Sequence, residues 1–235
     1  MARARLIQIL CLVVGLCIVS SPTHAQGVRI FAEGSGSFFL DQKFFSETVV
    51  IPQTGLARLD QFRSDYAPGG KVTLGTEFTN WKIFGVEAAY GYGTNNLRMT
   101  DLSTIPSTTQ GYGVKGQRFS GNLVLHSPVA VLKVRPYATA GLEFDRFNPT
   151  TQAKSAAFTQ GFAGQTVTLG ASNKLGFNYG GGAEWGFFPK LALRIDFRDH
   201  VTGSPTYGLS SHTYGISGAS HNPELSAGLV LHLGL

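Results

Sequence analysis

The chain has 235 residues, of which 14% are charged, and a formal net charge of +5 with its histidines neutral. This length fits a signal segment followed by one domain, and so small a charge does not indicate nucleic-acid binding. Both cysteines, Cys11 and Cys17, lie near the N-terminus, so the rest of the chain is excluded from disulfide, thiolate-metal and cysteine-nucleophile chemistry.

The N-terminal segment has the three parts of an export signal. Arg3 and Arg5 give it a basic start, residues 6–19 are mostly apolar, and Thr23-His24-Ala25 has the small-x-small pattern of a cleavage site. A permanent anchor is disfavoured, because the apolar run is shorter than a spanning helix requires. We therefore expect a Sec signal peptide over residues 1–25, cut before Gln26, and one domain over residues 26–235.

Eight segments of this domain alternate between apolar residues and small or polar ones, which is typical of strands with one apolar face. The clearest is 191–200, and the last segment, 225–235, carries leucine or alanine at every second position. In chain order the predicted strands are 28–40, 70–79, 82–93, 116–126, 130–145, 174–187, 191–200 and 225–235. Within the fifth strand Pro136 cannot donate a hydrogen bond, so we expect either a local bulge or a shifted strand boundary there.

The connections between these strands alternate in length. Short turns are predicted near 80–81, 127–128 and 188–189, whereas long polar connections cover 41–69, 94–115, 146–173 and 201–223. This sorting is typical of outer-membrane barrels, with the long loops at the cell surface and the short turns in the periplasm. We therefore predict an all-β fold, an eight-stranded antiparallel up-and-down transmembrane β-barrel. A soluble β-sandwich is the alternative.

The C-terminal strand also carries a family resemblance. The stretch from Ser226 to Leu233 resembles the terminal signal that bacterial outer-membrane barrels present to the barrel-assembly machinery, with Ser226, Gly228, Leu231 and Leu233 in the matching positions and a final leucine where an aromatic residue is common. Residues 136–142 and 180–185 look like the glycine-rich strands of the OmpA-like and OmpW-like families. The resemblance implies an eight-stranded barrel in the outer membrane, in contact with its lipid and lipopolysaccharide, and we expect a monomer.

The inward faces of the predicted strands gather most of the charged residues. An eight-stranded barrel has a lumen that side chains fill, and charges that face it must pair to offset their desolvation. We expect a structural polar network; the alternative is a gated path for ions or small solutes. The predicted network consists of Glu33, Lys71, Glu77, Glu87, Arg118, Glu143, Glu184, Arg194, Asp196 and Arg198, with His200 and His232 on the same faces.

Titratable residues near the long connections raise the question of an enzyme. Asp199, with His200, His212 or His221 and with Ser210 or Ser211, could in principle form a catalytic set. Adjacent strand residues point to opposite faces, however, so Asp199 and His200 do not act together. We expect no enzyme, cofactor or metal site, and a barrel that anchors four surface loops for envelope integrity or surface interaction. A narrow channel and a lipid-A-modifying enzyme are the alternatives.

Overall fold

The structure is a computed structural model that describes residues 27–40, 43–50, 57–80, 83–102, 106–160, 169–208 and 218–234. The predicted signal peptide and its cleavage site lie outside the described residues, as do Ser210, Ser211 and His212. Within them, no helix is long and apolar enough to cross a membrane.

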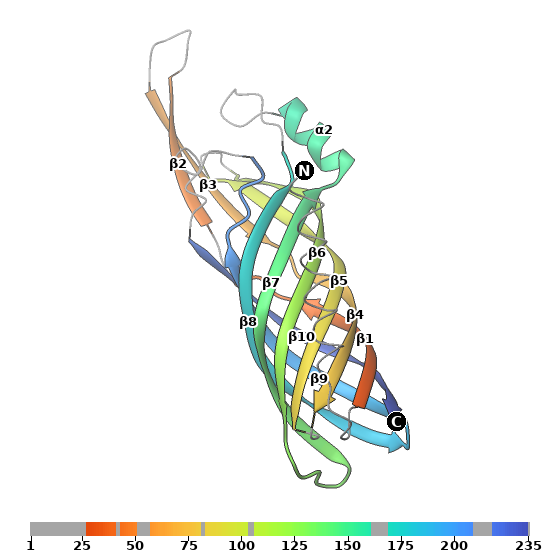
Figure 1. Cartoon of the computed structure of the whole chain (residues 1–235). Coiled ribbons are helices and arrows are strands. Elements are labelled where there is room, and N and C mark those ends of the chain that lie inside the picture. The colour runs from red at the N-terminus through yellow and green to blue at the C-terminus, as the bar shows by residue number, and fades with distance from the viewer. Residues whose placement is uncertain are drawn as a thin grey trace, which may run out of the picture.

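Eight long strands form a closed antiparallel barrel (Figure 1). Each is hydrogen-bonded to two neighbours, and the last strand pairs with the first from Gly27↔Gly234 to Ser37↔Glu224. The predicted eight-stranded antiparallel barrel is therefore confirmed. Around the cylinder the strands are β1 (Gly27–Ser37), β4 (Gly69–Asn80), β5 (Phe84–Asp101), β6 (Thr108–His126), β7 (Val134–Pro149), β8 (Ser172–Phe188), β9 (Leu191–Gly203) and β10 (Ala219–Gly234).

The barrel is apolar on its outer wall and polar within. Leu123, Leu142 and Leu175 are each at least 70% exposed, whereas Glu77 and Glu87 are fully buried. A soluble protein distributes these residue types the other way round. Closure also gives every strand two partners, which is what a sheet needs where no water can satisfy its peptide groups. The strand alternation read from the sequence therefore predicts the correct faces.

The strands run further at one end than the sequence predicts, and we call the end with the long connections the outer end. The predicted loop 94–115 is mostly strand, because β5 and β6 stay paired from Thr94↔Lys115 to Asp101↔Thr108. The predicted loop 41–69 contains a hairpin, β2 (Lys43–Val50) and β3 (Ala57–Tyr66). Beyond the end of β4 the edge of β5 is open, and β3 pairs with it there, from Phe62↔Asp101 to Tyr66↔Leu97.

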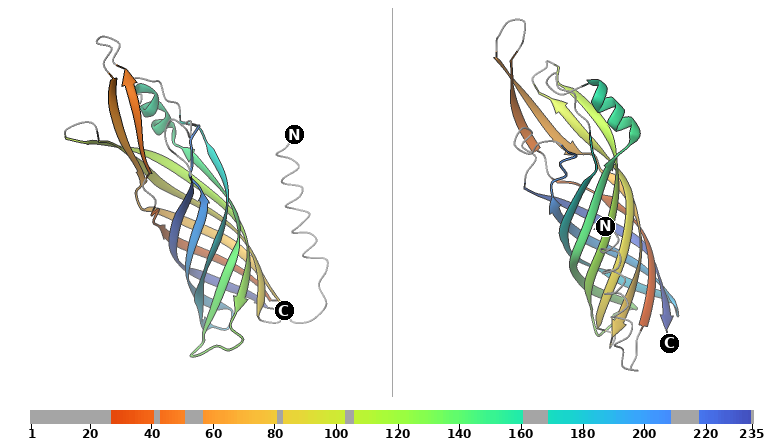
Figure 2. Two further views of the ribbon diagram at one scale, coloured as in Figure 1. Left: turned by 90° about the vertical axis from the view of Figure 1, so that its left-hand side faces the viewer. Right: turned by 45° about the horizontal axis from the view of Figure 1, so that its top comes forward.

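The predicted loop 146–173 contains a helix, α2 (Thr151–Gln160), which follows β7 directly. Thr150 caps it, since its Oγ1 accepts a hydrogen bond of 3.2 Å from the amide of Ala153. Figure 2 shows α2 and the β2–β3 hairpin together at the end of the barrel opposite the C-terminus. Where the structure describes them, the outer connections are thus largely strand or helix, which corrects the prediction of polar loops.

Of the two expectations for Pro136, the shifted boundary is correct. β7 begins at Val134, four residues later than predicted, after a turn in which Leu132 and Lys133 have φ of 51° and 66°. The register continues through Pro136 opposite Ala183. The Ser127 carbonyl lies opposite Pro136, which has no N–H to donate to it. Arg135 Nε donates a hydrogen bond of 3.0 Å to this carbonyl instead. A bulge lies instead between Gly186 and Phe188, and it turns Phe188 rather than Phe187 to the outer wall.

Candidate functional site

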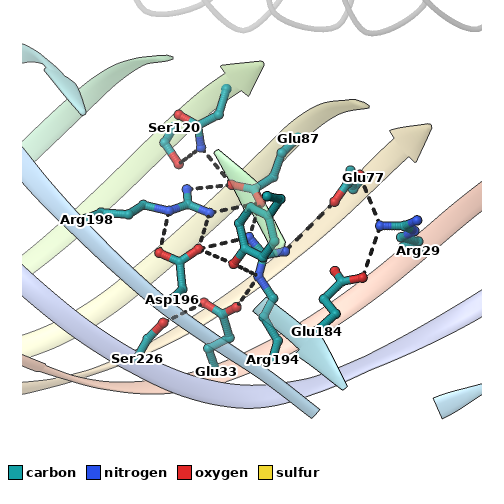
Figure 3. Close-up of polar contacts among 12 residues, drawn as sticks. Arg29, Glu33, Glu77, Glu87, Ser120, Glu184, Arg194, Asp196, Arg198 and Ser226 are labelled. Carbon is teal, nitrogen blue, oxygen red and sulfur yellow. Dashed lines mark hydrogen bonds and ion pairs between the residues drawn. The ribbon is translucent and has the colours of Figure 1, made fainter. Parts of the chain in front are cut away.

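The lumen is the part of the barrel where the polar side chains gather, and all ten residues of the predicted network lie in it. Nine are buried, and the Lys71 side chain is 12% exposed. They come from seven strands, and ion pairs cross the cylinder between strands that are distant in sequence. Figure 3 shows the central part of this network. From the short-turn end to the outer end we describe it as a lower, a middle and an upper layer.

The lower layer is built around Arg29. Its Nη1 lies 3.2 Å from Glu184 Oε2 and 3.5 Å from Glu77 Oε1. His126 Nε2 lies 2.6 Å from the same oxygen of Glu77 and 2.9 Å from Arg29 Nη1. The half-buried Arg135 lies next to Glu184 in the β7–β8 register, at the end of the cylinder. Two carboxylates and two guanidinium groups therefore balance at this end of the lumen.

The middle layer is built around Arg194 and Arg198, two residues apart on β9. Glu87 accepts from Arg194 Nη2 at 2.8 Å and from Arg198 Nη1 at 2.7 Å. Asp196 accepts from the same two side chains at 3.2 and 2.8 Å. Glu33 lies 2.9 Å from Arg194 Nε, and its other oxygen accepts from Ser226 at 3.2 Å. These contacts join three carboxylates to two guanidinium groups.

Aromatic rings hold Arg194 in place across the lumen. Its guanidinium carbon lies 4.6 Å from the ring centroids of both Phe31 and Tyr137, and its Nε donates to the Tyr137 hydroxyl at 2.6 Å. Tyr137 in turn donates to Asp196. Gly182 makes room for this ring, since an added Cβ there would lie 2.6 Å from the Tyr137 hydroxyl oxygen. Cation–π contact and hydrogen bonding therefore fix the central charge in one position.

The upper layer is built around Arg118 and Lys71. Arg118 pairs with both oxygens of Asp145, at 2.7 and 3.1 Å, and donates to Glu224 at 3.2 Å. Lys71 forms an ion pair with Glu224. Glu143 lies 3.6 Å from Arg118 Nε and 2.6 Å from His200 Nδ1. This layer also contains three carboxylates and two cations, together with one histidine.

Sequence reasoning missed several members of this network. Arg29, His126 and Tyr137 lie on the predicted inward faces, so strand alternation alone could have identified them. Asp145 ends a predicted strand and Glu224 lies one residue outside another; the longer observed strands bring both inside. His232 is only half-buried, at the short-turn end, where its amide donates to the carbonyl of Lys190 at 2.8 Å.

Two small voids lie within the lumen of the described barrel. One, of about 30 Å³, lies between the middle and upper layers and is lined by residues of both, including Glu33, Arg198, Lys71 and His200. Another, also of about 30 Å³, lies beyond the upper layer and is covered by Phe39 and Phe147. Lys71 and Arg118 line both voids and separate them. Such volumes hold about one water each.

An apolar cluster, which we call the cap, closes the outer end of the cylinder. The inward positions of β5 and β6 become apolar there, and the Tyr66 and Tyr207 hydroxyls share a hydrogen bond. Burial raises the pKa of the Tyr66 hydroxyl above its ordinary value. Tyr207 reaches the cap from a turn with φ of 52°. The cap consists of Leu97, Met99, Tyr112, Val114, Phe147, Ala153, Leu169 and Tyr207, with Phe39 and Tyr66 packed against it.

The catalytic candidates are separated in the way that strand alternation predicts. His200 points into the lumen, toward Glu143. Asp199 points to the outer wall, where its Oδ2 accepts from the Tyr179 hydroxyl at 2.9 Å and lies 2.8 Å from His221 Nδ1. The carboxylate therefore approaches His221 and not His200.

The predicted insertion-signal residues lie on the strand that closes the barrel. Ser226 contacts Glu33 inside, while Leu231 and Leu233 are exposed on the outer wall. Gly228 lies against β1 so closely that an added Cβ would collide with the Ala32 carbonyl. Recognition of these residues by an assembly machinery stays a prediction.

Comparison with known proteins agrees with this architecture. A family model described as outer membrane protein beta-barrel domain matches residues 10–219. Among solved structures, OprG from Pseudomonas aeruginosa is 12% identical, with a TM-score of 0.56 over 90% of this chain and 98% of that one. The Neisserial surface protein NspA is 14% identical, with a TM-score of 0.46 over 88% and 96%. Identities this low bear on the fold alone, and no curated protein matches the chain.

Proposed function

Because the chain belongs to the outer membrane protein β-barrel domain family, we propose that it is a closed, monomeric scaffold of the outer membrane, without enzymatic activity. It holds its folded outer connections at the cell surface, for envelope integrity or for interaction with other molecules. Its partners in the membrane are lipid and lipopolysaccharide along the apolar wall, and the barrel-assembly machinery during insertion.

The observation that carries this proposal is the obstructed lumen. Arg194 spans the middle of the cylinder between Phe31 and Tyr137, and the ion pairs of Arg118 and Lys71 cross it again above. The voids between these obstructions hold about one water each. A solute or hydrated ion would have to break several buried ion pairs at once, and each broken pair costs about 3–5 kcal/mol.

The outer end supports a role in presentation. The apolar cap joins the extended β5 and β6 to α2 and to the turn at Tyr207. The attached β2–β3 hairpin projects beyond it (Figure 2). Binding residues concentrate on loops that a rigid scaffold holds. Here the scaffold itself extends past the apolar outer wall, because β5 and β6 stay paired to Asp101↔Thr108. A preformed surface of this kind loses little conformational freedom on binding.

Planar-bilayer recording tests the proposal. The purified chain should give no discrete conductance steps, even at high protein load. Insertion is checked separately by the unboiled gel mobility of the chain recovered from lipid vesicles, so that a silent bilayer is not mistaken for a failure to insert. Uniform steps from the unmodified chain would instead establish the channel alternative.

Mass spectrometry of lipid A from expressing cells tests the enzyme alternative. We expect lipid A masses equal to those of an empty-vector strain, and a changed mass would favour the enzyme.

A further inference from the structure

The middle and upper layers of the lumen each contain one more carboxylate than they have cations. In the middle layer Glu33, Glu87 and Asp196 face Arg194 and Arg198. In the upper layer Glu143, Asp145 and Glu224 face Arg118 and Lys71. The lower layer differs, because Arg29 forms ion pairs with Glu77 and Glu184 there, and the Arg135 guanidinium interacts electrostatically with the same two carboxylates. The excess is therefore confined to the two enclosed layers.

Other charged groups near these layers do not remove the excess. Arg194 Nη1 lies 3.9 Å from Glu77 of the lower layer, so this guanidinium is shared rather than added. Beyond the upper layer, Lys174 lies opposite Asp145 in the β7–β8 register, but its chain runs beside Gly203, and no ion pair joins it to the carboxylates of the described residues. Asp65 and Arg98 balance each other in the outer extension. Asn122 and Asn178 are neutral.

An uncompensated buried charge is too costly to persist in such a site. We propose that each of the two layers binds one small monovalent cation when the barrel folds, and that this cation is a proton. The proposal does not depend on the scaffold function, because a channel with this lumen would need the same compensation.

The contacts indicate where each proton resides. In the middle layer Glu87 and Asp196 both accept from two guanidinium groups, and Asn122 also donates to Glu87 at 2.7 Å. Glu33 has only Arg194 Nε, which also donates to Tyr137, and one serine hydroxyl. Its Oε1 has no properly aligned hydrogen bond among the described residues. Glu33 is the least compensated carboxylate, so it holds the proton of the middle layer.

In the upper layer the proton belongs to the pair of His200 and Glu143. His200 Nδ1 lies 2.6 Å from one oxygen of Glu143, whereas the other oxygen has no hydrogen-bond partner among the described residues. On its other side, His200 Nε2 lies 3.6 Å from Glu224. The void of about 30 Å³ is lined by Glu33 and His200 together, so a single water there could exchange protons between the layers.

The test counts protons taken up during folding. The urea-unfolded chain is diluted into detergent micelles at pH 8 in weakly buffered solution, and the acid needed to hold the pH is measured. At this pH unfolded carboxyl groups are ionised and unfolded histidines are neutral. We expect an uptake of about two protons per chain, following from one excess carboxylate per layer. Glu33→Gln should lower the uptake by one, and Glu33→Gln/Glu143→Gln by two.

Controls separate the proton from other cations. Lys190→Gln changes an exposed charge outside the lumen and should leave the uptake unchanged. Folding is compared in sodium chloride and in tetramethylammonium chloride. Equal uptake in the two salts supports the proton, whereas uptake that falls as sodium rises shows that sodium occupies the same layers. Uptake near zero in both salts, with folding insensitive to the cation, overturns the proposal.

A second measurement uses only the unmodified chain, in case the variants do not fold. A folded state that binds two more protons than the unfolded state loses stability as the pH rises. The unfolding equilibrium constant should therefore increase about a hundredfold per pH unit above about pH 7.5, where the unfolded histidines are mostly neutral. A constant that does not change between pH 7 and pH 8.5 would contradict the inference independently of any variant.

Discussion

Replacement of Arg194 by methionine removes the central cation of the lumen with little change in side-chain volume. The neighbours of Arg194 differ in what they keep. Glu87 and Asp196 retain Arg198, and Asp196 also retains the Tyr137 hydroxyl. Glu33 retains only the Ser226 hydroxyl. Because Glu33 holds the proton of the middle layer, the main cost is that two buried carboxylates, Glu87 and Asp196, are left to share the single guanidinium of Arg198.

The magnitude follows from this difference. Removal of one partner from a buried ion pair costs about 3–5 kcal/mol, because the other charge is left uncompensated. The lost contacts with the Phe31 and Tyr137 rings add about 1–2 kcal/mol. Together these contributions lead us to expect that Arg194→Met reduces the free energy of unfolding by about 4–7 kcal/mol.

A double-mutant cycle identifies the cause. Glu87→Gln in the Arg194→Met background removes one of the two carboxylates that the first substitution leaves sharing Arg198, so about 1–3 kcal/mol should be recovered. Unfolding is followed in urea with the barrel in lipid vesicles, by tryptophan fluorescence, to which Trp185 on the outer wall contributes. The unboiled gel mobility reports whether each variant folds. A cost below about 1 kcal/mol for Arg194→Met, or no recovery in the double variant, would refute a paired core.

Three further substitutions test the lumen glycines, the outer wall and the cap. Gly182→Ala places a Cβ against the Ile195 carbonyl and the Tyr137 ring and should cost about 1–3 kcal/mol in urea unfolding, whereas Gly34→Ala, with open space around its Cβ, should cost much less. Leu123→Arg puts a charge on the exposed apolar wall and should cost about 2–4 kcal/mol in vesicles; Leu102→Arg, beyond the apolar belt, serves as its control, and equal losses would argue against a lipid-facing wall. Tyr207→Ala empties a buried position of the cap and should speed proteolysis of the outer connections without changing the unboiled gel mobility. Unchanged proteolysis would show that the cap does not hold them.

Strand alternation predicts the barrel well because one physical rule governs the whole membrane-spanning part. Residues such as Ile195 and Phe197 face lipid, and Arg194 and Asp196 face the lumen. Each segment therefore repeats with a period of two, and the short turns follow from the closure of neighbouring strands. The positions of ten charged residues could be predicted from this rule, but their pairing could not, since partners such as Arg118 and Glu224 come from strands far apart in the sequence.

The same rule fails at the outer end because the environment reverses. Leu97 and Met99 have the same parity as Glu87, and Tyr112 and Val114 the same parity as Arg118. Above the polar layers the interior becomes apolar, so the apolar face of the strand turns from outside to inside. An alternation pattern that assumes an apolar outer face throughout stops matching at this point. The rest of β5 and β6 is then mistaken for a loop. Helix α2 is missed for a related reason, because its threonine, serine and glutamine residues are typical of loops.

The cap and the charged part of the lumen are connected because the same two strands, β5 and β6, contribute residues to both. β5 has 18 residues and β6 has 19, and each carries charged lumen residues along one part and cap residues along the other. The second void has Lys71, Arg118 and Asp145 of the upper layer on one side and Phe39 and Phe147 of the cap on the other. Strands paired over this length do not bend easily between the two regions. The cap and the upper layer therefore share β5, β6 and the walls of one void, so we expect a substitution that displaces the cap to affect Arg118 and its carboxylates before the middle layer.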